Sequence, residues 1–438
     1  MKAKQGATSL KDSESGQLFN PGDENPVHPS SRKLRLPTIP TFKALEYRNF
    51  ALLWFGLILS NIGTWIQIIA QSLLVLALTH NSGVALGVVS FAQAFPFFIF
   101  ALLGGGIADR VDKRKLLLFT QSVQIILAFT LGILTFTGFI QFWQIIIIST
   151  LSGVTLSFDQ PTRFALIPFL VPREDLSNAI SLNSVAFNGA AIIGPALGGV
   201  LVVLIGFAGN FFVNGVSFVA VLIALLLMKV PKHISPSTHT VLRGIREGLV
   251  YIRGKNLLLP LLINYGSLLF FGATYTVLLS LFAVVVLDTN PAGLGLLYTA
   301  LGIGTIIGSL GLASLGDYER KGALLMISSL LFSFSVVIFS FSRVFWLSFT
   351  LLLVVAGTQT ILGALTITLL QLNSPRHMLG LVMSLNTLII MGIRPMGGFP
   401  FGALANVVGV AASIALGAVI SAMVSLYIFS SNKGLRNL

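Results

Sequence analysis

GGGIADRVDKRK, residues 104–115, separates two long apolar runs and carries six charged residues in the seven positions from Asp109 to Lys115. Elsewhere charge is sparse, since only 9% of the 438 residues are charged and 55% are hydrophobic. About a quarter of a soluble domain is charged, so this composition indicates a chain that folds in lipid. The charged stretch is then a surface loop between two spanning helices.

Segments without Asp, Glu, Lys or Arg give the number of spans, because a helix needs roughly 20 apolar residues to cross about 30 Å of hydrocarbon. The runs 49–108, 116–158, 176–228 and 377–432 each contain a polar or glycine-rich break and hold two helices, and Arg394 alone interrupts the last. The runs 256–287, 289–316, 322–342 and 344–375 hold one each. The sequence predicts an all-α integral membrane protein with twelve transmembrane helices.

The positions of the basic residues predict the orientation, because short loops rich in Lys and Arg stay on the cytoplasmic side. With the N-terminus inside, 25 of the 27 Lys and Arg residues lie in the tails and the cytoplasmic loops. The net charge of +13 is therefore explained by topology. A nucleic-acid partner would need a clustered basic face on a soluble domain, and the sequence has none.

The chain divides into a disordered cytoplasmic tail (1–47), a six-helix bundle (48–228), a cytoplasmic linker (229–255), a second six-helix bundle (256–432) and a cytoplasmic C-terminus (433–438). In the linker Leu242, Ile245, Leu249 and Ile252 recur at helical spacing, which suits an interfacial helix in contact with membrane lipid. SerLeuAsn occurs at 181–183 and again at 384–386, and AspTyrGluArgLys (317–321) is a weaker counterpart of AspArgValAspLysArg (109–114). These offsets indicate two parallel repeats.

Two motifs make the chain resemble the major facilitator superfamily of secondary transporters. Gly105, Asp109, Arg110 and Arg114 match its loop motif, although Asp112 stands where the usual pattern has glycine. PheAspGlnProThrArgPheAlaLeuIlePro (158–168), ValProArgGluAspLeu (171–176) and SerLeuAsnSer (181–184) are similar to the exporter branch with enterobactin-type siderophore exporters and macrolide efflux proteins. The resemblance covers roughly residues 40–430 and implies the major facilitator fold, in the inner membrane and as a monomer.

The resemblance implies that the charged loop gates the opening and closing of the transporter. Asp317 and Arg320, in the corresponding loop of the second half, would have the same role. Asp109 would meet the positive end of helix 11, near residues 376–378, and hold the two halves together in one state. The alternative is that the charges only fix the topology. The string Gly194, Pro195, Gly198 and Gly199 resembles the helix-5 motif of antiporters, with Ala190 in place of its leading glycine, and the alternative there is ordinary tight packing.

Polar residues on the predicted helices are candidates for lining a substrate cavity. Asn61, Thr64, Trp65, Gln71 and Ser72 share about a third of the circumference of the first helix, with Gln67 at its margin. Other helices add Gln93, Asn188, Asn264, Tyr265, Tyr275, Gln359 and Asn386. Such residues also bond neighbouring helices, so each has a packing alternative.

Arg394 is the one charge expected well inside a span, in the outer half of the bilayer. It would either extend along the lipid toward the outer surface or face the cavity and bind an anionic, catecholate-like substrate. The resemblance implies proton antiport, but we expect no carboxylate deep in a span, because Asp109, Asp159 and Asp317 fall at cytoplasmic ends. Uptake of a metabolite by symport and lipid translocation are the other functions open to this fold.

No enzyme, cofactor or metal site is expected. The stretch Gly248–Asn256 has the wrong spacing for a phosphate-binding loop, no HisGluXaaXaaHis sequence is present, and the absence of cysteine excludes thiolate ligands. The sequence therefore predicts export of a siderophore or a macrolide-like drug by alternating access.

Overall fold

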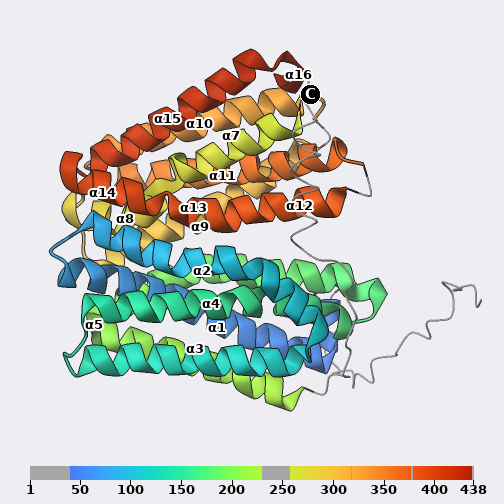
Figure 1. Cartoon of the computed structure of the whole chain (residues 1–438), viewed down its shortest axis with the longest axis vertical. Coiled ribbons are helices and arrows are strands. Elements are labelled where there is room, and N and C mark those ends of the chain that lie inside the picture. Colours follow the sequence, from blue (N-terminus) through green and yellow to red (C-terminus); the bar gives the residue numbers. More distant parts are fainter. Residues whose placement is uncertain (1–39, 229–256, 317, 376–377, 437–438) are drawn as a thin grey trace, which may run out of the picture.

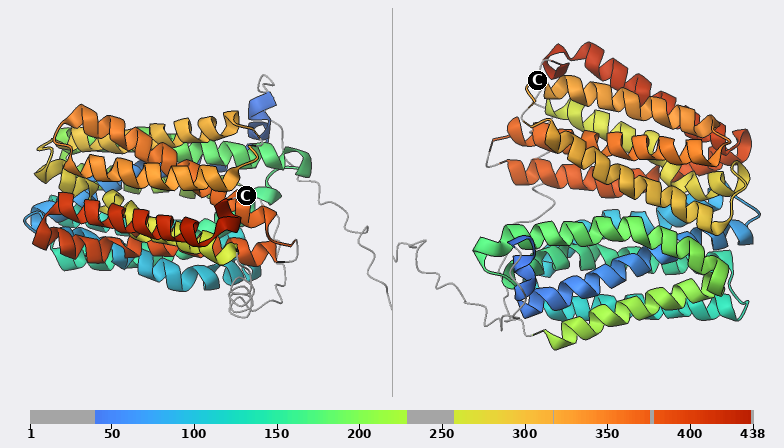
Figure 2. Two further views of the ribbon diagram at one scale, coloured as in Figure 1. Left: turned by 90° about the horizontal axis from the view of Figure 1, so that it is seen from above. Right: turned by 180° about the vertical axis from the view of Figure 1, so that it is seen from behind.

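The computed structural model describes residues 40–228, 257–316, 318–375 and 378–436, with only the helical backbone given at residues 40, 98, 101–110, 380, 384, 391, 433 and 436. Most of the expected tail and linker lie outside the described residues. Within these ranges the protein is helical and contains no strand, which confirms the expected all-α class. The helices form two stacked groups, as Figure 1 shows and the two views of Figure 2 repeat.

The first group comprises α1 (Arg48–Leu78), α2 (Gly83–Arg110), α3 (Lys113–Phe136), α4 (Phe142–Leu166) and α5 (Leu176–Leu227). The second comprises α7 (Leu258–Phe270), α8 (Tyr275–Val285), α9 (Pro291–Ser314), α10 (Lys321–Phe341), α11 (Phe345–Leu372), α12 (Leu379–Leu388), α13 (Arg394–Met396), α14 (Gly398–Val408), α15 (Val410–Ser431) and α16 (Lys433–Arg436). We call these groups the N-terminal and C-terminal halves.

The helices and the membrane crossings do not correspond one to one, because one helix makes two crossings and some crossings consist of several short helices. Within the described residues nine helical stretches are long and apolar enough to cross a membrane. The 52-residue α5 holds two crossings, because Gly206 adopts a φ of 71° that reverses the chain. With α5 counted as two crossings these stretches give ten, and α2 and the series α12–α14 are the candidates for the remaining two of the twelve that the sequence predicts.

Two crossings of the C-terminal half are interrupted inside the membrane-length stretch. The short 3₁₀ turn Gly272–Thr274 separates α7 from α8, and a π-helical turn, Ile389–Ile393, separates α12 from α13. Both interruptions lie in uncharged sequence, and the two regions pack against each other. Breaks in membrane helices often mark functional positions.

The contacts between the halves that involve described residues gather toward one end of the molecule. We call the end where α1 begins and α15 ends the terminal end, and the opposite end the distal end (Figure 1). Contacts between the halves are made chiefly by α5 with α9 and by α2 with α14. The hydrogen bonds between described residues of the two halves join Asn406 to Ser82 and Gly83, Ser280 to Ser72, and Thr299 to Ile192. They lie in the distal half, so the molecule is closed at its distal end.

A short segment before α1 is tied to the turn between α4 and α5. Lys43 forms an ion pair of 2.9 Å with Asp175, and the Tyr47 hydroxyl donates a hydrogen bond of 2.7 Å to the same carboxylate. The Ala44 N–H donates to the Asn178 side chain at 2.9 Å. Burial, followed by the hydrogen bond to Asp175, raises the pKa of Tyr47 to about 12. The starts of α1 and α5 are thereby held together.

Tyr47→Phe should lower the apparent melting temperature in detergent by about 2–4 °C, because a hydrogen bond to a charged group contributes about 1–3 kcal/mol. A pKa raised in the folded state means that this stabilisation is complete below pH 10 and is lost as the pH rises through about 12. Thermal unfolding at pH 7, 9 and 11 measures the effect. A variant as stable as the wild type at pH 7 would contradict the role of this bond.

Candidate functional site

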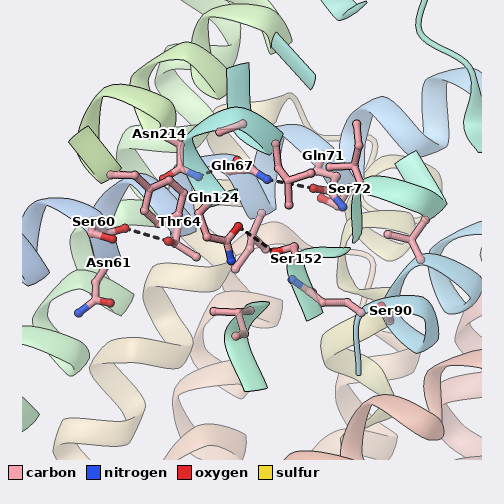
Figure 3. Close-up of a pocket in the computed structure, with 18 of the residues that line it drawn as sticks. Ser60, Asn61, Thr64, Gln67, Gln71, Ser72, Ser90, Gln124, Ser152 and Asn214 are labelled. Atoms are coloured by element: carbon pink, nitrogen blue, oxygen red, sulfur yellow. Dashed lines mark hydrogen bonds between the residues drawn. The ribbon is translucent and has the colours of Figure 1, made fainter. Parts of the chain in front are cut away.

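A cavity of about 300 Å³ lies among α1–α5 and reaches the C-terminal half. Figure 3 shows polar side chains from several helices turned into it. The lining residues from the N-terminal half include Ser60, Asn61, Thr64, Gln67, Gln71, Ser72, Ser90, Gln93, Gln121, Gln124, Ser152, Asp159, Gln160, Arg163 and Asn214. The C-terminal half contributes Thr276, Val277 and Tyr298.

Carboxamide groups dominate this lining, and a chain of hydrogen bonds fixes three of them. Asn214 donates to Gln67 at 2.6 Å, Gln67 donates to Gln71 at 3.3 Å, and Gln71 donates to Ser149 at 2.9 Å. The chain therefore links α5, α1 and α4, and Figure 3 labels its members Asn214, Gln67 and Gln71. A bonded network of this kind holds polar groups in fixed positions.

Other carboxamides in the lining remain available to a ligand. Asn61, Gln93 and Gln160 form no side-chain hydrogen bond with any described residue, and each offers both a donor and an acceptor. The face of α1 that was expected to line a cavity does so through Asn61, Thr64, Gln71 and Ser72. Gln67, expected at its margin, belongs to the lining as well.

The expectation that Asp159 lies at the end of a span is wrong. Asp159 is only 1% exposed, lies seven residues before the end of α4, and lines the cavity. Its carboxylate contacts the Arg163 guanidinium one helical turn away. It also accepts hydrogen bonds from Thr120 at 2.7 Å and Gln121 at 2.8 Å, both on α3. The pair is thus a buried, nearly neutral unit beside the cavity.

The remaining predicted polar residues have other surroundings. Trp65 packs its ring against Tyr298, with centroids 6.1 Å apart. Asn264 bonds to Ser329 and Ser425, which joins α7 to α10 and α15 and favours its packing alternative. Tyr275 donates to Gln359 at 2.9 Å, Asn188 bonds to the Ser184 carbonyl on its own helix, and Asn386 is buried. None of these belongs to the described lining of the cavity.

The glycine string of α5 faces two different neighbours. Gly194 and Gly198 face α1, where a Cβ on Gly198 would lie 2.9 Å from the Ile66 Cα. A Cβ on Gly199 would overlap the Pro291 carbonyl oxygen of the other half, and Gly295 meets the Pro195 carbonyl in the same way. Gly83 and Gly87 on α2 approach the backbone of α14 as closely. We call these contacts the distal seam.

The charged loop has a local structure that the sequence did not suggest. Asp112 caps α3 by accepting from the backbone N–H groups of Arg114 at 3.0 Å and Lys115 at 3.2 Å. The Arg114 guanidinium donates to the carbonyls of Leu225 and Leu226 at the end of α5, within its own half. Arg320 is exposed just before α10. The side chains of Asp109 and Arg110, the surroundings of Gly105, and all of Asp317 lie outside the described structure, so the gate stays a prediction.

Two halves of membrane helices around a polar cavity, closed at one end, define the class of a multi-pass membrane transporter. Residues 39–435 match the transmembrane secretion effector family, and the chain belongs to this branch of the major facilitator superfamily. It is therefore a transporter of small molecules and not an enzyme, as the sequence predicted.

Several characterised proteins are similar to the chain. The staphyloferrin A transporter of Staphylococcus aureus is 29% identical over 63% of this chain and 70% of its own length. The multidrug efflux pump Tap of Mycolicibacterium fortuitum is 24% identical over 83% and 90%, and the enterobactin exporter EntS of Citrobacter koseri is 26% identical over 80% and 82%. These relatives include exporters of siderophores and of drugs.

Solved structures share the fold. A bacterial homologue of the human lysosomal transporter Spinster has a TM-score of 0.69 at 13% identity and covers 91% of this chain and 98% of its own. A POT family transporter in complex with 5-aminolevulinic acid has a TM-score of 0.70 at 14% identity and covers 89% and 96%. The fold is thus that of the major facilitator superfamily.

Gly199→Ala should open the distal seam, because the added methyl group meets a backbone oxygen of the other half. Overpacking costs about 1–3 kcal/mol, which shifts a two-state equilibrium by about 5- to 150-fold. Spin labels on cysteines at the exposed positions His80 and Val407 report the separation of the halves by electron resonance. The chain has no native cysteine, so no other site is labelled.

Gly198→Ala is the matched control, since its methyl group meets α1 of the same half. It should lower thermal stability without lengthening the distance between the labels. If both variants leave the label distances unchanged, the seam does not hold the distal end closed.

Proposed function

We propose that this protein exports a small polar organic molecule, a siderophore or a macrolide-like drug, across the cytoplasmic membrane by alternating access. The observation that carries the proposal is the polar cavity, part of whose lining is held by hydrogen bonds, while the described contacts between the two halves gather toward the distal end. A cavity between separable halves serves alternating access, because the substrate site keeps its shape as the seam opens and closes.

The terminal end is cytoplasmic in this proposal, with both termini inside. The distribution of Lys and Arg over the tails and the terminal-end loops supports this orientation. The described conformation then faces the cytoplasm, the side from which an exporter loads its substrate. The siderophore and drug exporters among the similar proteins favour export over uptake by symport or lipid translocation.

Inward movement of protons supplies the energy in this proposal, and Asp159 is the residue that exchanges the proton. Among the described residues, Asp159 is the carboxylate that lines the cavity. Its carboxyl group contacts Arg163 and two hydrogen-bond donors, so it keeps a partner with or without a bound proton. A proton on Asp159 would abolish its attraction to Arg163, whereas Thr120 and Gln121 stay hydrogen-bonded to its other oxygen. Two other charged side chains at this end of the N-terminal half are engaged elsewhere: Lys113 lies over the Phe169 ring and Arg114 binds α5.

The experiment compares two modes of transport in proteoliposomes, with radiolabelled substrates chosen from a siderophore and macrolide panel. Asp159→Asn should abolish accumulation driven by a pH gradient but retain exchange of labelled for unlabelled substrate. Because this change leaves the partly buried Arg163 without its carboxylate partner, the double variant Asp159→Asn/Arg163→Gln is tested beside it. Glu174→Gln, at an exposed carboxylate, is the control and should transport normally.

Three outcomes would contradict parts of the proposal. Wild-type protein that accumulates none of the panel under a pH gradient contradicts proton-driven export. Normal gradient-driven accumulation by the double variant removes Asp159 from coupling. Transport of labelled lipid in place of the panel favours a translocase.

A further inference from the structure

Arg394 is a positive charge within a membrane-length helical series, and no described residue neutralises it. It is half-buried and forms no ion pair within the described part of the chain. The acidic residues of the C-terminal half are Asp288, Asp317 and Glu319; Asp288 and Glu319 lie in loops between helices, and Asp317 is outside the described residues. An intramembrane arginine without a carboxylate needs another partner.

The surroundings of Arg394 place it on the interior side of its helix. It follows the π-helical turn Ile389–Ile393 directly, and this region packs against α7 and the turn between α7 and α8. Gly397, three residues on, touches the Phe270 carbonyl, and Ile389 and Ile393 lie next to Gly266. A lipid-facing arginine would not be held between these elements, so the alternative of snorkelling to the surface is disfavoured.

Tyrosine hydroxyls from three helices lie within electrostatic reach of the Arg394 guanidinium. They belong to Tyr265 on α7, Tyr275 on α8 and Tyr298 on α9, and all three side chains are buried. Tyr298 also lines the cavity, so the Arg394 region borders it on the side of the C-terminal half. Arg394, Tyr265 and Gln359 are not themselves in the described lining, so a ligand in the cavity would contact them by extending past Tyr298.

Two of these hydroxyls are engaged and one is free. Tyr298 donates to the Thr276 carbonyl at 3.0 Å and Tyr275 donates to Gln359 at 2.9 Å. The Tyr265 hydroxyl forms no hydrogen bond with the described residues, and it lies beside Gly363 of α11. Gln359 accepts through its oxygen and keeps its amide nitrogen as a donor. The region thus combines a guanidinium, a free phenol and a free amide, all hydrogen-bond donors.

We propose that Arg394, with the hydroxyl of Tyr265 and the amide of Gln359, binds an anionic oxygen group of the exported substrate, a carboxylate or a deprotonated catechol. A planar guanidinium pairs with two oxygens at once. The amide-lined cavity of the N-terminal half would hold the neutral, hydrogen-bonding part of the same molecule. This inference rests on the proposed transport function, because it names the class of substrate.

Binding to purified full-length protein in detergent tests the inference without requiring transport or proton coupling. The probes are a catecholate siderophore and a citrate-type carboxylate siderophore, each compared with its methylated, uncharged derivative. Arg394→Gln should weaken binding of the anionic probes by about 10- to 100-fold and of the methylated derivatives by less than about twofold. Arg394→Lys and Tyr265→Phe should each have an intermediate effect.

Arg343→Gln is the matched control, since it removes the same charge from an exposed position outside the helices. It should leave binding of both kinds of probe unchanged. An equal loss for charged and methylated probes in Arg394→Gln and Arg394→Lys would show a purely structural role, and no loss for the anionic probes would also overturn the inference. If the wild type binds the anionic probes as expected but accumulates none of them under a pH gradient, the proposed energy coupling fails while the anion site stands.

Discussion

The close approach of backbone to backbone along the distal seam is the constraint on which the rest of the structure depends. Gly199 lies against Pro291, and Gly295 against Pro195, so no side chain separates α5 from α9 at these points. In lipid the hydrophobic effect does not drive helices together, and small residues that allow close packing take its place. The few hydrogen bonds across the seam are weak enough to break, which allows the halves to separate during transport.

The charged side chains inside the two helical halves are arranged differently: those described in the N-terminal half neutralise each other, and the one in the C-terminal half has no carboxylate partner among the described residues. In the N-terminal half Asp159 and Arg163 neutralise each other beside the cavity, and carboxamides form much of its wall. In the C-terminal half Arg394 has phenols around it and no described carboxylate partner. This asymmetry suits a substrate with a neutral, hydrogen-bonding body and an anionic group, and it separates the residue proposed for the proton from the residue proposed for the substrate.

The sequence predicted the fold well, because a helix that crosses lipid must be almost free of charged residues, and long uncharged segments therefore identify the spans. It also predicted the polar face of α1, since Asn61, Thr64 and Gln71 follow a helical period. The sequence analysis misplaced Asp159. Two charged residues four positions apart, Asp159 and Arg163, end the uncharged segment and so look like the start of a loop, although the two side chains pair within the helix. The breaks at Gly272–Thr274 and Ile389–Ile393 lie in uncharged sequence, so only three-dimensional packing reveals the surroundings of Arg394.

The most direct measurement of the central claim is a reversible lock across the distal seam. Ser82 and Asn406 are joined by a hydrogen bond of 3.1 Å, and in a chain without native cysteine Ser82→Cys/Asn406→Cys can form one disulfide only. If the seam must open in each cycle, the oxidised protein binds substrate from the terminal end but transports none, and reduction restores transport. Normal transport by fully oxidised protein would contradict the account.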